Sequence, residues 1–176
     1  RAVIFCGISN VSLAQIAITL SAPSPVAAAD VCKGATNASV FSFRIAGSGT
    51  GSTNVVNAIS FNQTGTAAFP TDIVQYTLWR DAIGGSGVVL GTTVGSTFSG
   101  LTEAFNASTT INYFITANVA TGATTGATII GGTMTSTNIT SASGAGTVSG
   151  SAAAQGTQTI RDRPTVPSIT TGATPI

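Results

Sequence analysis

Apolar and polar residues alternate along most of the chain from residue 16 onward, and turn residues separate the alternating runs. The clearest run is TTINYFITANVA, residues 109–120, in which Ile111, Tyr113 and Ile115 fall on one face. A period of two residues indicates a half-buried β-strand. The same alternation predicts strands over residues 16–22, 39–46, 55–61, 72–80, 87–93, 96–101, 127–134, 135–140 and 146–160.

Many short strands, with no segment that favours a helix longer than one turn, are typical of an all-β fold. We therefore expect an Ig-like antiparallel β-sandwich over residues 15–160. The alternation also predicts which side chains form the core, because a register slip of one residue would expose a whole set of inward side chains to solvent. Val55 and Val74 are expected to point inward with the main core set, which comprises Phe41, Phe43, Ile45, Ile59, Phe61, Tyr76, Leu78, Ile111, Tyr113 and Ile115.

The stretch YTLWRDAIGGSGVVLGTTVG, residues 76–95, contains the single tryptophan of the chain. Tyr76 and Leu78 share one face of the predicted strand, so Trp79 lies on the other. An exposed Trp79 beside Arg80 and Asp81 could stack on a sugar. The alternative, which the sequence favours, is a framework hairpin: GGSG makes the turn, Trp79 covers an edge, and the Arg80–Asp81 pair is solvated and contributes at most ~1 kcal/mol.

Only 6% of the residues are charged, against about 25% in a typical soluble domain, and Ser, Thr, Asn and Gly supply the polarity instead. Uncharged hydroxyl surfaces of this kind are common in extracellular β-proteins. The formal net charge of +1 gives no electrostatic reason to expect nucleic acid or an anionic membrane as a partner. Histidine is absent, which excludes Ser-His-Asp and Cys-His catalysis. We expect no cofactor and no enzymatic activity.

Both ends of the sequence differ from its middle. RAVIFCGISNVSLA, residues 1–14, begins with a basic residue, continues through a short apolar run and ends in small residues, as the tail of a secretory signal peptide does. The alternative is a first strand of the domain. The apolar run is too short to span a membrane, which needs ~20 residues. Residues 161–176 hold three of the six prolines and indicate a linker to a following module.

Cys6 and Cys32 are the only two cysteines. If residues 1–14 are retained, a Cys6–Cys32 disulfide is possible in an oxidising compartment. If they are removed, Cys32 is left alone. The five acidic residues are widely spaced, which disfavours a glycosidase pair and a carboxylate-rich Ca²⁺ site, although a site with one carboxylate and several carbonyls stays open. We expect no metal site from this pattern.

Four motifs in order resemble the repeated β-sandwich modules of large secreted surface proteins of Bacteroidetes. They are ITLSAPSPVAAADVCKGATNASVFSFRIA, TDIVQYTLWRDA, VLGTTVGSTFSGL and INYFITANVATGATTGATI, and the resemblance extends over roughly residues 16–140. The resemblance implies an adhesin-like or polymer-forming surface protein of the type IX secretion type, with no catalytic residues to carry over. Cys32 departs from the pattern, which usually has a polar residue there.

The first hypothesis is therefore a non-enzymatic structural or adhesive module of a secreted or cell-surface repeat protein, whose partners are neighbouring modules, surface glycans or like subunits. A second is a carbohydrate-binding module that uses Trp79, Tyr76 and Tyr113, which requires an exposed Trp79. A third is a filament subunit in which residues 2–20 donate a strand to a neighbour.

Overall fold

The computed structural model describes residues 16–141 and 147–164, which form an all-β fold of thirteen strands with a single short 3-10 helix. The described elements are β1 (Ala17–Ser21), β2 (Ala29–Cys32), β3 (Ala38–Ser48), β4 (Asn54–Ser60), β5 (Ile73–Arg80), β6 (Val88–Thr93), β7 (Thr97–Phe105), β8 (Thr110–Val119), β9 (Thr128–Ile129), β10 (Met134–Thr135), η1 (Ser136–Asn138), β11 (Ile139–Ser141), β12 (Val148–Ala152) and β13 (Gln158–Arg161).

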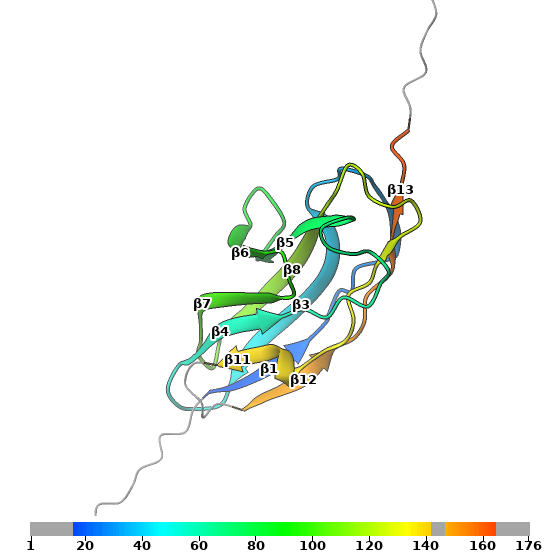
Figure 1. The fold of residues 1–176 in the computed structure, drawn as a ribbon. Coiled ribbons are helices and arrows are strands. Elements are labelled where there is room, and N and C mark those ends of the chain that lie inside the picture. Colours follow the sequence, from blue (N-terminus) through cyan, green and yellow to red (C-terminus); the bar gives the residue numbers. More distant parts are fainter. Residues whose placement is uncertain (1–15, 142–146, 165–176) are drawn as a thin grey trace, which may run out of the picture.

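The strands are arranged in three sheets (Figure 1). The main sheet has the order β10-β12-β1-β3-β8-β5-β6. A second sheet, β11-β4-β7, covers one face of the main sheet, and a third, β2-β13-β9, closes one end of the body. The second sheet exists because β4 and β7 each carry one apolar face that must be buried. The result is the expected β-sandwich.

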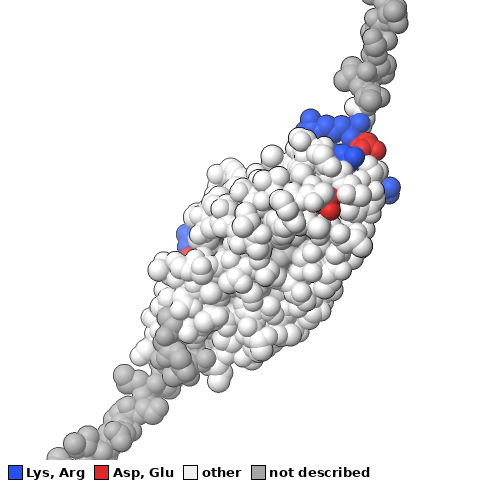
Figure 2. Space-filling view, in the orientation of Figure 1, with Lys and Arg blue, Asp and Glu red and all other residues white. Residues whose placement is uncertain are grey.

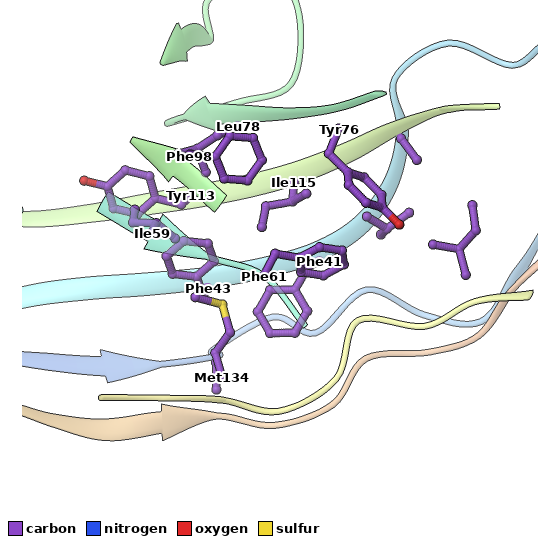
Figure 3. Packing of buried hydrophobic residues seen from close by; sticks show 14 of the residues in the cluster. Phe41, Phe43, Ile59, Phe61, Tyr76, Leu78, Phe98, Tyr113, Ile115 and Met134 are labelled. Carbon is purple, nitrogen blue, oxygen red and sulfur yellow. The ribbon is translucent and has the colours of Figure 1, made fainter. Parts of the chain in front are cut away.

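The core fills the space between the main sheet and the second sheet (Figure 3). Phe43 of β3 and Tyr113 of β8 stack with ring centroids 5.1 Å apart, and Phe61 meets Tyr76 edge to face at 5.0 Å. The alternation along β3, β5 and β8 predicted this set correctly except at Ile111, which is half-buried at the border of the core. Burying each large side chain contributes roughly 1.5–3 kcal/mol.

Two long ribbons run side by side in parallel along the body, and they correct the expectation of a purely antiparallel fold. The first ribbon, residues 17–33, contains β1 and β2, and the second, residues 147–162, contains β12 and β13. Strand β1 pairs in parallel with β12, and β2 pairs in parallel with β13. The partners are about 130 residues apart in sequence, as the bond between Gln158 and Ala27 illustrates (separation 131). We call this pair the terminal ribbons.

Side chains and glycines hold the terminal ribbons together where strand pairing lapses. Gln155 Oε1 accepts a hydrogen bond from the Val26 N–H at 2.5 Å, and Gln158 Nε2 donates to the Ala27 carbonyl at 2.8 Å. Both glutamines are buried. Gly156 allows the closest approach, because a Cβ there would lie 2.2 Å from the Ala28 nitrogen. Any larger residue at position 156 would push the ribbons apart.

The described chain enters and leaves the body at opposite ends of its long axis (Figure 1). Strand β1 starts at the end that contains the β3–β4 and β7–β8 turns, and β13 finishes at the other end. The expected donor segment, residues 2–20, is only partly described. Its residues 17–20 belong to β1, which is already paired on both sides, by β3 and by β12, so this part is not available to a neighbouring subunit.

Two inward assignments were wrong because the strands contain register shifts. The pairing of β5 with β8 shifts between Ile73 and Gln75, so Ile73 is buried and Val74 is 51% exposed. The pairing of β4 with β7 shifts between Val56 and Ala58, and Val56 rather than Val55 is fully buried. A β-bulge adds one residue to one strand and reverses the faces on either side of it.

Several strand boundaries also differ from the predicted ones. The predicted strand 127–134 is two strands in different sheets, β9 and β10, and the predicted strand 146–160 likewise divides into β12 and β13. Residues 136–138 form η1. Strand β2 was not expected, because its sequence ADVC does not alternate clearly. Strand β7 extends beyond the predicted residue 101 to the buried Phe105.

Candidate functional site

The three aromatic residues expected to stack on a sugar are all buried, and the structure does not gather them on one surface. Tyr76 and Tyr113 are 1% and 0% exposed and belong to the core. Trp79 is 9% exposed and lies on the opposite face of the main sheet. Its indole N–H donates to Thr116 Oγ1 at 2.9 Å. A stacking platform needs an open ring face, so these three residues do not form one.

Tyr76 carries a buried hydroxyl with no hydrogen-bond partner among the described residues. Its ring packs edge to face against Phe61 and Phe69. Burial raises the pKa of the Tyr76 phenol, which therefore remains protonated at all ordinary pH values. Tyr76 is buried because its large ring fills space in the core between Phe61 and Phe69.

Arg80 does not form only the solvated pair expected from the sequence. Its Nε lies 3.5 Å from Asp81 Oδ2, but its guanidinium also lies 3.2 Å from Glu103 Oε1 on β7. The Glu103 side chain is only 7% exposed, and Tyr113 donates its hydroxyl to Glu103 Oε2 at 2.9 Å. Folding thus brings two widely separated acids to one arginine. The Arg80 charge offsets the cost of burying the Glu103 carboxylate.

The pKa of Tyr113 is raised chiefly by burial and further by the negative charge of Glu103. The phenol therefore stays protonated and serves as a donor to the carboxylate. Both oxygens of Glu103 are occupied, by Arg80 and by Tyr113. This group of three side chains is a connection between the two layers of the sandwich.

Asp72 ties together two loops at the end of the body. Its carboxylate accepts the Thr124 N–H at 2.7 Å and the Ala68 N–H at 2.9 Å. Burial by itself raises the pKa of Asp72, but the hydrogen bonds from Thr124 and Ala68 outweigh it and lower the pKa below its ordinary value. A carboxylate that accepts backbone N–H groups is stabilised in its charged form.

Charged side chains gather where the terminal ribbons finish, and the rest of the visible face is uncharged apart from one small patch (Figure 2). Lys33 Nζ lies 2.7 Å from Asp162 Oδ1, and Arg161 lies 3.0 Å from Asp30. Hydrogen bonds from Lys33 and then from Thr125 keep the pKa of Asp162 below its ordinary value. We call these residues the charged end. They add polar contacts between the two ribbons at their last residues.

A pocket of about 140 Å³ lies on the outer face of the main sheet, over β3 and β8. We call it the Arg44 pocket. Arg44 and Asn112 face each other in the register of β3 and β8, and Arg44 Nε donates to Asn112 Oδ1 at 2.9 Å. The segment that follows β1 forms one wall, because Ser42 Oγ donates to the Ser24 carbonyl at 2.5 Å. The lining includes Pro23, Ser24, Ser42, Arg44, Asn112 and Phe114.

The apolar side chains that are most exposed lie mainly around the β5–β6 hairpin. Val88 and Val89 of β6 are 41% and 49% exposed, and Val94 just after it is 75% exposed. Strand β6 is the last strand of the main sheet on that side. An edge strand without charges is a place where another strand can pair.

Within the described residues, no three His, Cys, Asp or Glu side chains lie close enough together to hold a metal ion. Cys32 is exposed on β2, and its expected partner Cys6 lies outside the described residues. The expected signal remnant, residues 1–14, is likewise outside them, as is most of the predicted linker. No helix in the described part of the chain has the length and apolar character to cross a membrane.

Comparison with models of protein families, with curated proteins and with solved structures found no match to this chain. The function must therefore be argued from the arrangement of its own residues.

Two features that carry chemistry in the fold were not predicted from the sequence. Glu103 gave no signal, because its partner Arg80 is on another strand and in another sheet. Arg44 did give one: it is a lone cation on the outward face of a strongly alternating strand. Such a residue normally pairs with an acid on a neighbouring strand, and none of the registered positions beside it carries one.

Proposed function

We propose that this chain is a non-enzymatic structural or adhesive module of a secreted or cell-surface repeat protein, of the kind that its motifs resemble. One observation carries the proposal: the described chain enters at one end of a long body and leaves at the other. Modules with this geometry, when joined in series, form an extended array rather than a compact cluster.

The terminal ribbons support the same proposal because of how they would respond to tension. A pull on the two chain ends moves the two ribbons in opposite directions along their length. Strands β1 and β12, and strands β2 and β13, are parallel, so their hydrogen bonds are loaded together and not one after another. A connection loaded in this way resists extension, which suits a unit that holds a surface structure at a distance from the cell.

The surface supports an extracellular role. The charged residues make up 6% of the chain, and those at the charged end are largely paired with one another. Ser, Thr and Gly cover most of the remainder, which agrees with the hydroxyl-rich surface of extracellular β-proteins. The open edge at β6 supports contacts with like subunits beside the array.

Small-angle X-ray scattering of one, two and four copies of residues 15–176 joined in tandem tests the proposed array. The maximum dimension should rise by a similar increment for each added copy, because the chain ends lie at opposite ends of the module. A maximum dimension that levels off between two and four copies would rule out the spacer role.

The location is tested separately in the host that encodes the chain. Antibodies raised against the folded domain should label intact cells or the culture medium. Labelling that requires permeabilised cells would contradict a secreted or surface-exposed module.

A further inference from the structure

The Arg44 pocket holds a cation that no acid neutralises within the described part of the chain. Arg44 is half-buried, and among the described residues its only side-chain partner is the Asn112 oxygen. Lys33, Arg80 and Arg161 lie against acids. Arg163, like Arg44, has neutral oxygens as partners, but it is exposed, whereas Arg44 is half-buried in a pocket. A half-buried guanidinium in a pocket with no acid beside it indicates an anionic ligand.

The bond from Arg44 Nε to Asn112 Oδ1 also fixes the direction of the guanidinium. With Nε occupied at 2.9 Å, the two terminal nitrogens of Arg44 are left to the ligand, and they present the planar fork that a carboxylate fits with two hydrogen bonds. The Asn112 amide nitrogen makes no hydrogen bond within the described residues and adds a further donor beside the fork. The pocket volume of about 140 Å³ is equivalent to roughly four or five water molecules, less than the ~300 Å³ of a drug-sized site.

The walls of the pocket favour a sugar over a peptide. Phe114 and Pro23 supply apolar ring surfaces, and Ser24, Ser42 and Asn112 supply polar groups around them. An extended peptide gains most of its affinity from a free strand edge. Strands β3 and β8 have none, because β3 lies between β1 and β8, and β8 lies between β3 and β5. Recognition here depends on side chains alone.

We propose that the Arg44 pocket binds a single acidic sugar unit, a uronic acid at the end or on a branch of a glycan. Arg44 binds the carboxylate, Phe114 and Pro23 contact the apolar face of the ring, and Asn112 bonds a ring hydroxyl. This inference goes beyond the module role. The pocket is on the flank of the main sheet, so binding does not depend on how modules are joined.

Nuclear magnetic resonance titration of the full chain with a galacturonic acid trisaccharide tests the proposal. The side-chain signals of Arg44 and Asn112 and the backbone amide of Phe114 should shift. A neutral galactose trisaccharide should bind at least about tenfold more weakly, because it lacks the carboxylate. Arg44→Gln should weaken binding of the acidic trisaccharide by a similar factor, and Arg44→Lys by less, since it keeps the charge but loses the fork.

The control is Arg161→Gln, which removes one arginine charge at the exposed charged end, away from the pocket, and should leave the affinity unchanged. Unfolding midpoints of all three variants, compared with that of the unchanged chain, show whether the fold is intact. Three results would each overturn the proposal. The neutral trisaccharide could bind as tightly as the acidic one, or Arg161→Gln could weaken binding as much as Arg44→Gln does. A tri-glutamate peptide could also bind at Arg44 as tightly as the acidic trisaccharide. The scattering experiment on tandem copies needs no ligand. If the titration shows no binding of the acidic trisaccharide, the module role is therefore still decided by the scattering result.

Discussion

Arg80 lies between two carboxylates in very different surroundings. The Asp81 side chain is 60% exposed, whereas that of Glu103 is 7% exposed. The contact with Asp81 contributes little, because water screens it. The contact with Glu103 matters more, since a buried charge that loses its partner retains the full cost of leaving water.

Arg80→Ala is therefore expected to lower the free energy of unfolding by about 1–3 kcal/mol, more than the limit of ~1 kcal/mol that the sequence suggested. The partial exposure of Arg80 keeps the value below that of a fully buried pair. Urea melts measure it, with Arg161→Ala as the control. That pair, Arg161 with Asp30, is exposed on both sides, and its loss should cost less than ~1 kcal/mol. Equal costs for the two variants would show that Glu103 is solvated.

Trp79 is the single tryptophan, so its fluorescence reports on one site. Because it is 9% exposed, its emission in the native protein should be shifted to the blue and poorly quenched by acrylamide. Trp79→Phe removes the bond to Thr116 Oγ1 and should cost about 1 kcal/mol. Native emission like that of tryptophan in water would contradict the burial and reopen Trp79 as a sugar platform.

At the scale of elements, neighbouring residues of β8 have separate roles. Tyr113 and Ile115 point into the core, while Phe114 between them points to the outer face and the Arg44 pocket. The two faces of the strand thus carry stability and candidate binding separately.

Phe43→Ala, on the core side of β3, is expected to lower the free energy of unfolding by about 3–5 kcal/mol, because its ring stacks on Tyr113 and leaves a cavity. Phe114→Ala, on the outer side of β8, is the matched control and should cost less than about 2 kcal/mol. Chemical unfolding of both variants measures the difference. A larger loss for Phe114→Ala would mean that the inward and outward faces are reversed.

Asp72 makes the loop contacts at the end of the body sensitive to acid. Its pKa in the folded state is lower than its ordinary value of 3.8. The stabilisation is therefore fully present above about pH 4 and is lost as the pH falls through the folded-state pKa. Asp72→Asn should lower stability at neutral pH and make the decline between about pH 5 and pH 2 shallower, as thermal melts across that range would measure. An unchanged slope would show that Asp72 is solvated.

The sequence predicted those elements whose structure is decided locally. Alternation located β3, β5 and β8, because each carries an unbroken apolar face. It misplaced Val74 and Val55, because a bulge depends on the partner strand and not on the strand itself. It also missed the Arg44 pocket, because Pro23 and Ser24 form its wall only after the segment that follows β1 folds over β3.

At the scale of the whole molecule, the terminal ribbons were beyond sequence reasoning. Their partners are separated by about 130 residues, and residues 22–28 and 153–157 show no alternation that would reveal them. What joins them is a set of specific contacts: two buried glutamines, a close approach at Gly156 and the charged end. These contacts hold the two ribbons together from the segment between their paired strands to the charged end.

The central claim is that tension on the chain ends loads the terminal ribbons in shear. Single-molecule pulling in two directions tests it most directly. In one, the molecule is held at its two chain ends. In the other, it is held at its C-terminal end and at a cysteine introduced by Ser86→Cys, in the exposed turn of the β5–β6 hairpin, with Cys6 and Cys32 replaced by serine in both.

Pulling at the chain ends should require a severalfold higher force, because the hydrogen bonds of β1 with β12 and of β2 with β13 must break together. In the other direction, the load enters through the β5–β6 hairpin at the edge of the main sheet, so β1 and β2 are not pulled along their length against β12 and β13. Gln158→Ala should lower the force between the chain ends, whereas Gln63→Ala, whose bonds lie outside the ribbons, should not. Equal forces in the two directions, or an effect of Gln63→Ala as large as that of Gln158→Ala, would contradict the claim.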